Sequence, residues 1–458
     1  MSLRTIFFPY LKTFLKSIQP IFNVTYSSIL KARILFYLLF STSILFINCS
    51  GSKRFTSDEK NYEKDYEKDY EEDYKNDYEE EYESVFNSVR VLLDEKPNTL
   101  NITLSNKVYL LNEKNKIAEI NKGDNIQFYA NSHKLNVKVG RKNFAGKYFQ
   151  LVPADGELIK LSGKTYKGIL RITAFGNFVD IVNFINLEDY VKGVIAKEMP
   201  LGNGNENYDA LKAFAICVRT YALKKMNKGN GLFDIYPDTR DQVYGGQSAE
   251  ELISNKACDA TEGIILVYDD KPATIYYHST CGGFSENVEN VFSQYHLPYL
   301  TSVKDGGEPY CNISPRYKWK EVYTESQFIK QLYNAKLINN KNYGIDDIRI
   351  ESRFESGRVN DLEITIDSRS GRKEIHLYGN EIRSKIRTPE RNLSLWSTMF
   401  NVKVMGNGNI SFTGKGFGHG VGLCQWGAIG QSRLGIDYKN ILEHYYPGTV
   451  LGRFNDKS

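Results

Sequence analysis

The sequence has few cysteines and lacks the motifs that define several large enzyme classes. Six cysteines in 458 residues, scattered along the chain, are too few for a disulfide scaffold. There is no G-x-x-x-x-G-K-[ST] loop, which argues against a P-loop phosphate site, and no Gly-x-Ser-x-Gly elbow of the kind found in serine hydrolases. A net charge of only +4 argues against nucleic acid as a partner.

Acidic residues are absent from residues 1–48. Lys31 and Arg33 precede an apolar run at residues 34–47, which is the layout of an export signal. The run of 14 residues is shorter than the about 20 that a membrane-spanning helix needs. The string LFINC (45–49) resembles a relaxed lipobox, so we expect a lipoprotein lipidated at Cys49, in preference to an uncleaved membrane anchor. Either way the protein is expected in the cell envelope, facing the periplasm or the wall.

A low-complexity acidic segment follows the signal. Residues 58–83 contain four Lys against fourteen Asp and Glu, with tyrosine at every fourth position from Tyr62 to Tyr82. This charge density and the lack of aliphatic residues indicate a spacer, so residues 49–90 are interpreted as a tether. The remainder, residues 84–458, carries a net +7, which suits an anionic and extended partner such as cell wall.

The rest of the chain is expected to have an α+β fold with a mostly antiparallel β core. Short strands and turns predict a β-rich module at residues 91–164. A larger catalytic domain is expected at residues 165–450, followed by a short tail at 451–458. Within it, alternation predicts antiparallel strands at residues 348–354, 361–366 and 373–378.

The segment LEDYVKGVIAKEMP (187–200) predicts a helix that carries a carboxylate at its end. Asn186 is the expected N-cap, and apolar residues recur at helical spacing at Leu187, Val191, Val194 and Ile195. Pro200 cannot continue the helix, so Glu198 lies in the last turn, where the helix dipole disfavours a second negative charge. The pKa of Glu198 is therefore expected to rise, as a general acid requires. The alternative is a solvated glutamate at a helix end.

A second helix is expected at residues 208–223, packed against the first and fixing the direction of Glu198. The polar, glycine-terminated loop at residues 238–246 contains Gln242 and Tyr244. We expect it either to line a substrate groove or to be an ordinary surface turn.

Glycine occupies every second position from Gly414 to Gly422, around His419. Such spacing removes side-chain bulk and lets another backbone approach closely. Gln425 and Trp426 follow at once, and a Trp ring beside glycines suits stacking on a sugar. A tightly packed turn is the other interpretation.

The pair His278-x-x-Cys281 offers two zinc-competent ligands, and Cys311 or His296 could complete a tetrahedral site. A buried free thiol, or a Cys281–Cys311 disulfide, is the alternative.

Four separated motifs together resemble the SpoIID/LytB family. They are LEDYVKGVIAKEMP (187–200), ALKAFAICVRTY (210–221), HSTCGG (278–283) and GHGVGLCQWGA (418–428). The resemblance implies a lytic transglycosylase acting on peptidoglycan glycan strands without stem peptides, or an enhancer of a cell-wall amidase. It also implies that Glu198 is catalytic, and that zinc binds near His278 and Cys281 in some members. Cys424 departs from the serine usual in the family.

We therefore expect an envelope lytic transglycosylase that cleaves the MurNAc–GlcNAc bond and leaves a 1,6-anhydro product. No cofactor is required, and a structural zinc ion on His278, Cys281 and Cys311 is a candidate. The expected partners are glycan strands, a cell-wall amidase and the membrane that holds the lipid. A non-catalytic amidase enhancer and a zinc amidase using His278 and His419 are the alternatives. The residues expected to contact the sugar are Arg219, Gln242, Tyr244, His419, Gln425 and Trp426.

Overall fold

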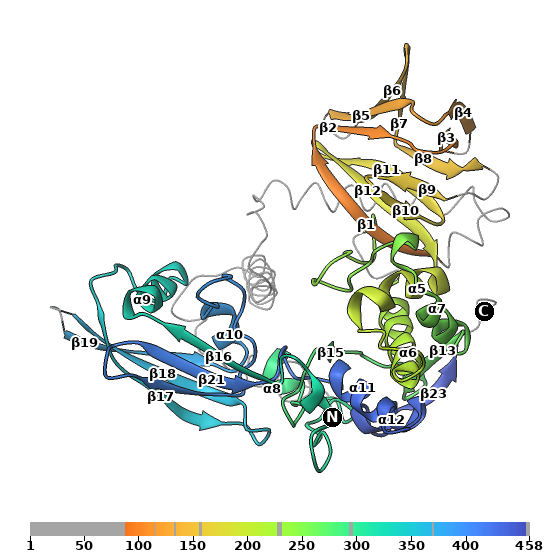
Figure 1. Ribbon diagram of the computed structural model, residues 1–458. Helices are drawn as coiled ribbons and strands as arrows, with labels where there is room; N and C mark the ends of the chain where they lie inside the picture. Colours follow the sequence, from red (N-terminus) through yellow and green to blue (C-terminus); the bar gives the residue numbers. More distant parts are fainter. Residues whose placement is uncertain are drawn as a thin grey trace, which may run out of the picture. The chain divides into compact units, whose positions relative to one another are not determined.

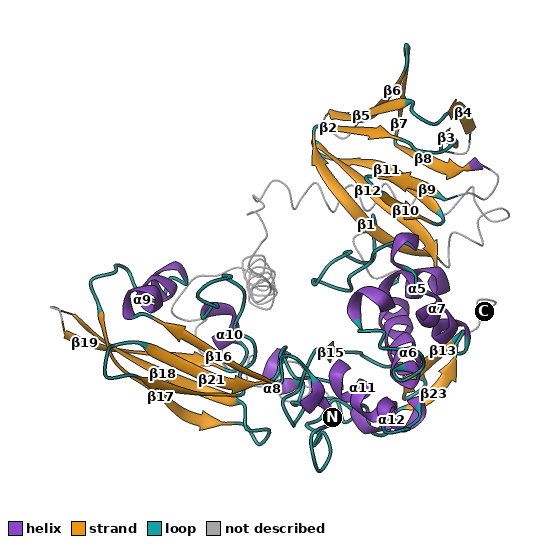
Figure 2. Ribbon diagram, viewed as in Figure 1, coloured by secondary structure: helices purple, strands orange, loops and turns teal. Residues whose placement is uncertain are grey.

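The computed structural model describes residues 88–454 except for residues 114, 132–133, 155–157, 227–230, 293–295 and 369–370 (Figure 1). The expected signal segment, Cys49 and nearly all of the tether lie outside the described residues. In the part that is described, no helix is both long and apolar enough to cross a membrane. Helices and mostly antiparallel sheets are mixed, as an α+β fold requires (Figure 2).

The first part of the chain forms two antiparallel sheets and a hairpin. The six-stranded sheet has the order β1 (Ser88–Pro97), β12 (Phe178–Asn186), β11 (Ile169–Phe175), β8 (Tyr148–Pro153), β3 (Val108–Asn112) and β4 (Asn115–Ile120). The four-stranded sheet has the order β2 (Thr99–Thr103), β5 (Asn125–Asn131), β6 (Lys134–Val139) and β7 (Lys142–Gly146). The hairpin is β9 (Ile159–Leu161) with β10 (Lys164–Tyr166). Because β8 pairs with β11, the large sheet continues across the expected boundary at residues 164/165.

Helices follow these sheets and share their buried core. They are α5 (Leu187–Glu198), α6 (Tyr208–Lys225), α7 (Leu252–Asp259), α11 (Gln425–Arg433) and α12 (Tyr438–Tyr445), with the short α8 (Glu289–Phe292), η2 (Gln247–Ala249) and η3 (Tyr310–Ile313). Helix α6 contacts α5, α7, α11 and α12, so it is the centre of this layer. Two small sheets complete it, one of β14 (Lys271–Pro272), β13 (Ile264–Tyr268) and β23 (Val450–Arg453), the other a parallel pair of β15 (Tyr277–His278) and β22 (Leu423–Cys424).

A second hydrophobic core is built from the chain between Trp319 and Phe412. It contains β16 (Lys318–Tyr323), β21 (Ile410–Lys415) and β20 (Phe400–Val404) in one sheet, β17 (Gly344–Arg353), β18 (Val359–Ser368) and β19 (Gly371–Tyr378) in another, and the helices α9 (Glu325–Asn334) and α10 (Glu381–Lys385). The three strands expected here from alternation are confirmed as an antiparallel set. Their separate core was not foreseen.

Helix α5 begins and ends where its residues dictate. The Asn186 side chain accepts a hydrogen bond from the Glu188 N–H at 2.8 Å, so it is the N-cap. The four apolar residues at helical spacing are all buried. The helix ends at Glu198, two residues before Pro200, which cannot continue a helix. The Glu198 carboxylate therefore lies at the C-terminal end of α5.

An ion pair between the buried Arg219 and the partly exposed Glu188 joins α5 to α6. Arg219 Nε and Nη2 donate to the two carboxylate oxygens of Glu188, each at 2.6 Å, and Nη1 donates to the Ile264 carbonyl at 2.9 Å. The Arg219 side chain is 0% exposed. Its donors are occupied and no solvent reaches it, so Arg219 holds the helices together and is not the sugar contact expected from the sequence.

Substituting Glu188→Gln should lower the free energy of unfolding by about 3 kcal/mol, because it leaves the Arg219 charge buried without its counter-ion. Urea denaturation of the purified protein measures this change. Glu119→Gln is the matched control, since Glu119 pairs with Lys107 and Lys116 at the surface and its loss should change stability little. Equal effects of the two substitutions would contradict this account of α5 and α6.

Candidate functional site

The Glu198 side chain is half-buried and held by the loop that follows α6. Its Oε1 accepts a hydrogen bond from the Val243 N–H at 2.7 Å. The backbone carbonyl of the same residue accepts from Gln425 Nε2 at 2.9 Å. The last carbonyls of an α-helix have no partner within the helix, and here a side chain from the start of α11 supplies one.

Burial raises the pKa of Glu198 above its ordinary value of 4.5. The Val243 N–H, which donates to Oε1, and the nearby Tyr277 and Gln425 side chains lower this pKa but do not cancel the effect of burial. The direction agrees with the prediction from the sequence, although that prediction rested on the helix dipole and the larger cause is desolvation. No other carboxylate in the described residues is among the groups that shift this pKa.

Three further buried polar side chains surround this carboxyl group. The Tyr190 hydroxyl donates to Gln242 Oε1 at 3.0 Å. The Tyr277 hydroxyl and Gln242 Nε2 are buried and lie near each other, yet neither makes a hydrogen bond of normal geometry within the described chain. Unpaired polar groups are costly in a core, so a hydrogen-bond partner such as a bound water would stabilise these two groups.

The loop at residues 238–246 lies directly on α5. The Gly245 N–H donates to the Gly193 carbonyl at 3.0 Å, and the Tyr244 ring lies against Gly193 where a Cβ would be only 2.6 Å away. The Tyr244 hydroxyl donates to Asn183 Oδ1 at 2.8 Å, and its side chain is buried. Tyr244 therefore anchors the loop and, contrary to expectation, is not exposed to a sugar. The loop contacts Glu198 through its backbone, at the Val243 N–H.

The alternating glycines let the segment after β21 pack closely against β15 and the residues that follow it. A Cβ at Gly418 would be 2.8 Å from the His278 Cβ, and one at Gly420 would be 2.6 Å from Arg358 Nε. Both glycines have positive φ, +115° and +94°. The close backbone approach expected from the sequence is thus present, and its partner is the core of the protein.

His278 and His419 are neighbours, with ring centroids 5.6 Å apart. His278 Nδ1 lies 3.2 Å from the Val421 carbonyl, and His419 Nδ1 accepts from the Val421 N–H at 3.0 Å. Burial lowers the pKa of both, that of His419 to about 3, so both rings are neutral. His419 packs against Tyr276 and Phe292. A sugar contact by His419 stays a prediction.

The expected zinc ligands are only partly brought together. Cys281 Sγ lies 3.4 Å from Cys311 Sγ, and Cys424 and Asp305 join them in one buried group. His278 is not in this group, because its ring turns to Val421. Strand β15 ends at His278 and the chain bends at Ser279, so the two residues of the His-x-x-Cys pair point to different surroundings. His296 is exposed beside Glu289 and is also apart from the group. The set of His278, Cys281 and Cys311 does not fit a metal ion.

Of the expected sugar contacts, Gln242 and Gln425 reach the surroundings of Glu198. Trp426 is half-buried in the first turn of α11, and its backbone N–H donates to the Ser279 carbonyl at 3.0 Å. Sequence reasoning missed Tyr190, Tyr277 and the Val243 N–H. The adjacent tyrosines before His278 were a usable signal, whereas a backbone donor leaves no trace in a sequence.

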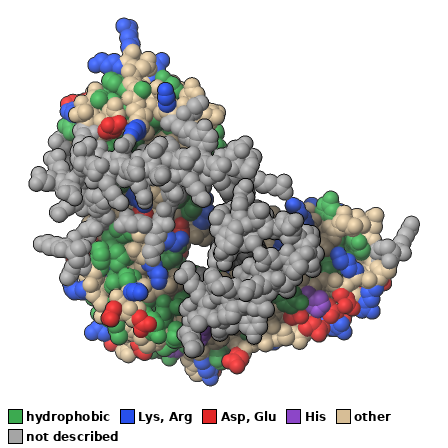
Figure 3. Space-filling view, turned by 180° about the vertical axis from the view of Figure 1, so that it is seen from behind, with side chains coloured by type: hydrophobic (Ala, Val, Ile, Leu, Met, Phe, Trp, Pro, Cys, Tyr) green, Lys and Arg blue, Asp and Glu red, His purple; other side chains and the backbone are tan. Residues whose placement is uncertain are grey.

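On the face shown in Figure 3, Lys and Arg side chains are interspersed with Asp and Glu side chains.

The site thus consists of one half-buried carboxylic acid with a raised pKa, surrounded by hydroxyl and amide groups. A raised pKa is a property that acid–base catalysis requires of a carboxyl group, so Glu198 is the candidate group of this site. The family model described as SpoIID, Stage II sporulation protein, matches residues 176–268, which include α5, α6 and the loop at Val243. A second model, described as a domain of unknown function (DUF8618), matches residues 311–422 and so covers the second core.

Three relatives extend the match. An uncharacterized protein of Brachyspira hyodysenteriae is 33% identical over 375 residues, covering 81% of this chain and 94% of the relative. Stage II sporulation protein D of Bacillus amyloliquefaciens is 34% identical over 287 residues, covering 59% of this chain and 75% of the relative. The amidase enhancer of Bacillus subtilis is 28% identical over 393 residues, covering 76% of this chain and 51% of the relative. The chain belongs to the SpoIID/LytB family.

Substituting Gly193→Ala should destabilise the protein by about 1–3 kcal/mol, because the new methyl group overlaps the Tyr244 ring. Helix propensity alone predicts the opposite sign, a gain of about 1 kcal/mol. Chemical denaturation distinguishes the two, with Ala196→Gly on the same helix as the control for propensity. A stabilised Gly193→Ala variant would show that the loop at residues 238–246 does not pack on α5 in this way.

Proposed function

We propose that this protein is a peptidoglycan lytic transglycosylase of the cell envelope, with Glu198 as its acid and base. Membership of the SpoIID/LytB family supports a role at peptidoglycan. The four sequence motifs are the basis of the resemblance to that family. The observation that carries the proposal is the environment of Glu198: a half-buried carboxyl group with a raised pKa and donors on its oxygen.

A single carboxylic acid suffices for this reaction. Protonated Glu198 gives its proton to the glycosidic oxygen as the bond to the muramic residue breaks. The resulting carboxylate, stabilised by the Val243 N–H, then removes the proton from the C6 hydroxyl of that residue. The C6 oxygen closes on C1, which yields the 1,6-anhydro sugar and returns the proton to Glu198. Gln425 and Tyr277 are the candidates for hydrogen bonds to the sugar hydroxyls, whereas the Gln242 side chain is 0% exposed and, like that of Arg219, lies inside the core.

The same proposal includes export and anchoring through Cys49. Its support is the apolar run at residues 34–47 and the cysteine that follows. The tether at residues 49–90 would then hold the body at a distance from the membrane and within reach of glycan strands.

Glu198→Gln should lower the rate of anhydro product formation from denuded glycan strands by roughly 10²- to 10⁴-fold, because the amide is too weak an acid to protonate the glycosidic oxygen. Mass spectrometry of the digested strands measures the product. Glu262→Gln, the same substitution at an exposed glutamate, is the control and should keep full activity. Equal product from wild type and Glu198→Gln would refute the proposed mechanism.

Tyr277→Phe should move the alkaline limb of the pH–rate profile to higher pH. The Tyr277 hydroxyl lowers the pKa of Glu198, so its removal lets that pKa rise. The acid then stays protonated, and active, to a higher pH. Tyr378→Phe, at an exposed tyrosine, is the control and should leave the profile in place. A limb that moves to lower pH would contradict the role assigned to Tyr277.

A non-catalytic amidase enhancer is the second candidate, favoured by the match to the Bacillus subtilis protein of that name. The two functions differ in one result. If the protein binds intact sacculi and accelerates a cell-wall amidase, and Glu198→Gln does so equally well with no anhydro product from either, the enhancer function holds.

A further inference from the structure

The four-stranded sheet of the first core has one buried face and one outer face. Its inward side chains are apolar and buried, among them Leu100, Phe128 and Val137. Side chains alternate between the two faces of a strand, so the residues between these lie on the outer face. Strand pairing arranges them in rows that run across the sheet. One row consists of Asn101, Gln127, Lys138 and Asn143. The next consists of Thr99, Tyr129 and Asn136. We call these two rows, together with Lys134, the polar face.

The polar face presents hydrogen-bonding groups that suit a sugar polymer. None of its residues is buried. Each amide side chain offers both donors and an acceptor, which is what hydroxyl and N-acetyl groups require of a partner. The half-exposed Tyr129 adds a flat ring with a polar tip in the middle of the sheet. Because these groups come from four strands, they form an extended surface that can contact several sugar rings in succession.

The polar face is also positively charged. Residues 125–154 contain five Lys and Arg and no Asp or Glu. Lys134 and Lys138 are exposed and lie four positions apart on β6, which separates them by about 13 Å along the strand. Arg141 and Lys142 are exposed at the tip of the β6–β7 hairpin. Figure 3 shows Lys and Arg side chains at the end of the molecule that carries this hairpin.

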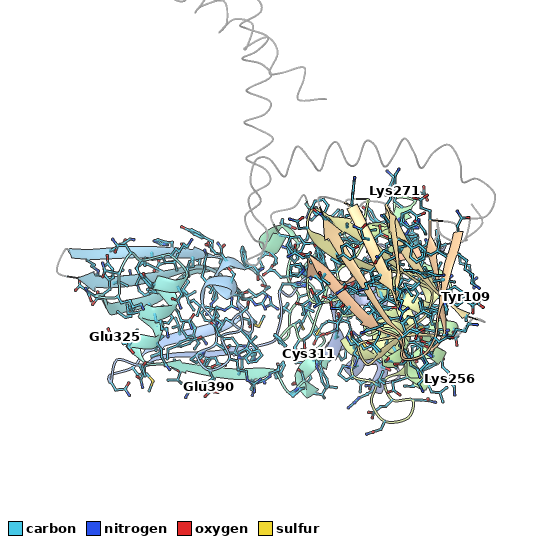
Figure 4. The ribbon with its side chains drawn as sticks, turned by 90° about the horizontal axis from the view of Figure 1, so that it is seen from above. Tyr109, Lys256, Lys271, Cys311, Glu325 and Glu390 are labelled. Atoms are coloured by element: carbon cyan, nitrogen blue, oxygen red, sulfur yellow. The ribbon has the colours of Figure 1, made fainter. Side chains whose placement is uncertain are left out.

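The other sheet of the first core lacks this excess of positive charge. Lys116 Nζ and Lys107 Nζ lie 3.8 Å and 5.5 Å from the centre of the Tyr109 ring, which is labelled in Figure 4. Both lysines pair with Glu119, at 2.6 Å and 2.9 Å. Strands β2, β5, β6 and β7 contain no carboxylate, so nothing on them offsets the attraction of Lys134 and Lys138 for an anion.

The hairpin tip favours a polymer over a lipid surface as the anionic partner. Protein segments that dock on a bilayer combine basic residues with large apolar side chains that enter it. The tip has the sequence Val139-Gly140-Arg141-Lys142. No large hydrophobic side chain is among the exposed ones in the described residues between 88 and 154. This surface can therefore attract an anionic layer but has nothing to insert into it.

We propose that the polar face binds an acidic polysaccharide, with Lys134 and Lys138 on its carboxylates and the amides and Tyr129 on its sugar rings. For the identity of the polymer this inference rests on the proposed function. That function makes the polymer a glycan strand whose muramic residues carry free lactyl carboxylates once the stem peptides have been removed. The polar face lies outside residues 176–268 and 311–422, which the two family models match, and it does not include the surroundings of Glu198.

The test measures binding of denuded glycan strands to the full-length Glu198→Gln protein, which leaves the strands uncut. Adding Lys134→Gln and Lys138→Gln should raise the Kd by roughly 3- to 30-fold, because two exposed ion pairs are lost. Lys256→Gln with Lys271→Gln is the matched control and should leave the Kd in place. It makes the same change of charge at two exposed lysines outside the polar face, both labelled in Figure 4.

Two further measurements separate the lysines from the amides. Asn101→Ala with Gln127→Ala should raise the Kd by roughly 3- to 10-fold without changing its dependence on salt, because these contacts carry no charge. The lysine substitutions should reduce that dependence. Strands whose carboxylates have been chemically reduced to alcohols should bind the protein with intact lysines as weakly as native strands bind the lysine variant. This last comparison needs no change in the polar face.

Three results would each overturn the proposal. They are equal binding by the lysine variant and its matched control, unchanged binding of carboxyl-reduced strands, and binding to vesicles of anionic phospholipid with none to the strands. All substituted side chains point outward, so thermal unfolding should stay the same and an unfolded variant would be recognised. The measurement requires no catalysis. Absence of anhydro product would therefore refute the mechanism at Glu198 without removing the binding expected at the polar face.

Discussion

The site depends on one hydrogen bond that spans 227 positions of the chain, from Gln425 Nε2 to the Glu198 carbonyl. The end of a helix cannot be buried cheaply while its last carbonyls have no donors. Gln425 is the first residue of α11, so the helix that supplies the donor must start at this place. The burial of the helix end at Glu198 therefore depends on the position of α11.

That constraint sets the chemistry of the carboxyl group. Burial makes the protonated form of Glu198 more stable, while the Val243 N–H and its neighbours stabilise the anion. Neither effect alone would suit a group that must give up a proton and then take one back. Because burial outweighs the opposing groups, the pKa is raised, and at neutral pH a raised pKa brings the protonated form closer in free energy to the anion, as a shared acid and base needs.

The sequence predicts the features that depend on neighbouring residues, and it fails for those that depend on residues far apart in the chain. The N-cap at Asn186, the end of α5 at Glu198 and the strands of the second core follow from residues a few positions apart, and they are found as expected. Arg219 was misjudged because its partner Glu188 is 31 residues away, on another helix. The buried cysteine group joins positions more than a hundred residues apart, a proximity that no local period encodes. His278 was wrongly predicted to belong to this group, because that prediction rested only on its spacing from Cys281.

In the sequence, the second core lies between two cysteines of the buried group, Cys311 before it and Cys424 after it. The chain leaves the first core after Cys311 and returns to it through the glycine segment that ends at Cys424. At each of the even positions from Gly414 to Gly422, a Cβ would come within 3.0 Å of atoms already in place. Evolutionary drift in this stretch is therefore confined to the odd positions, while the even ones have no neutral alternatives. Descendants of this gene that remain functional will keep that alternation even where little else of the surrounding sequence survives.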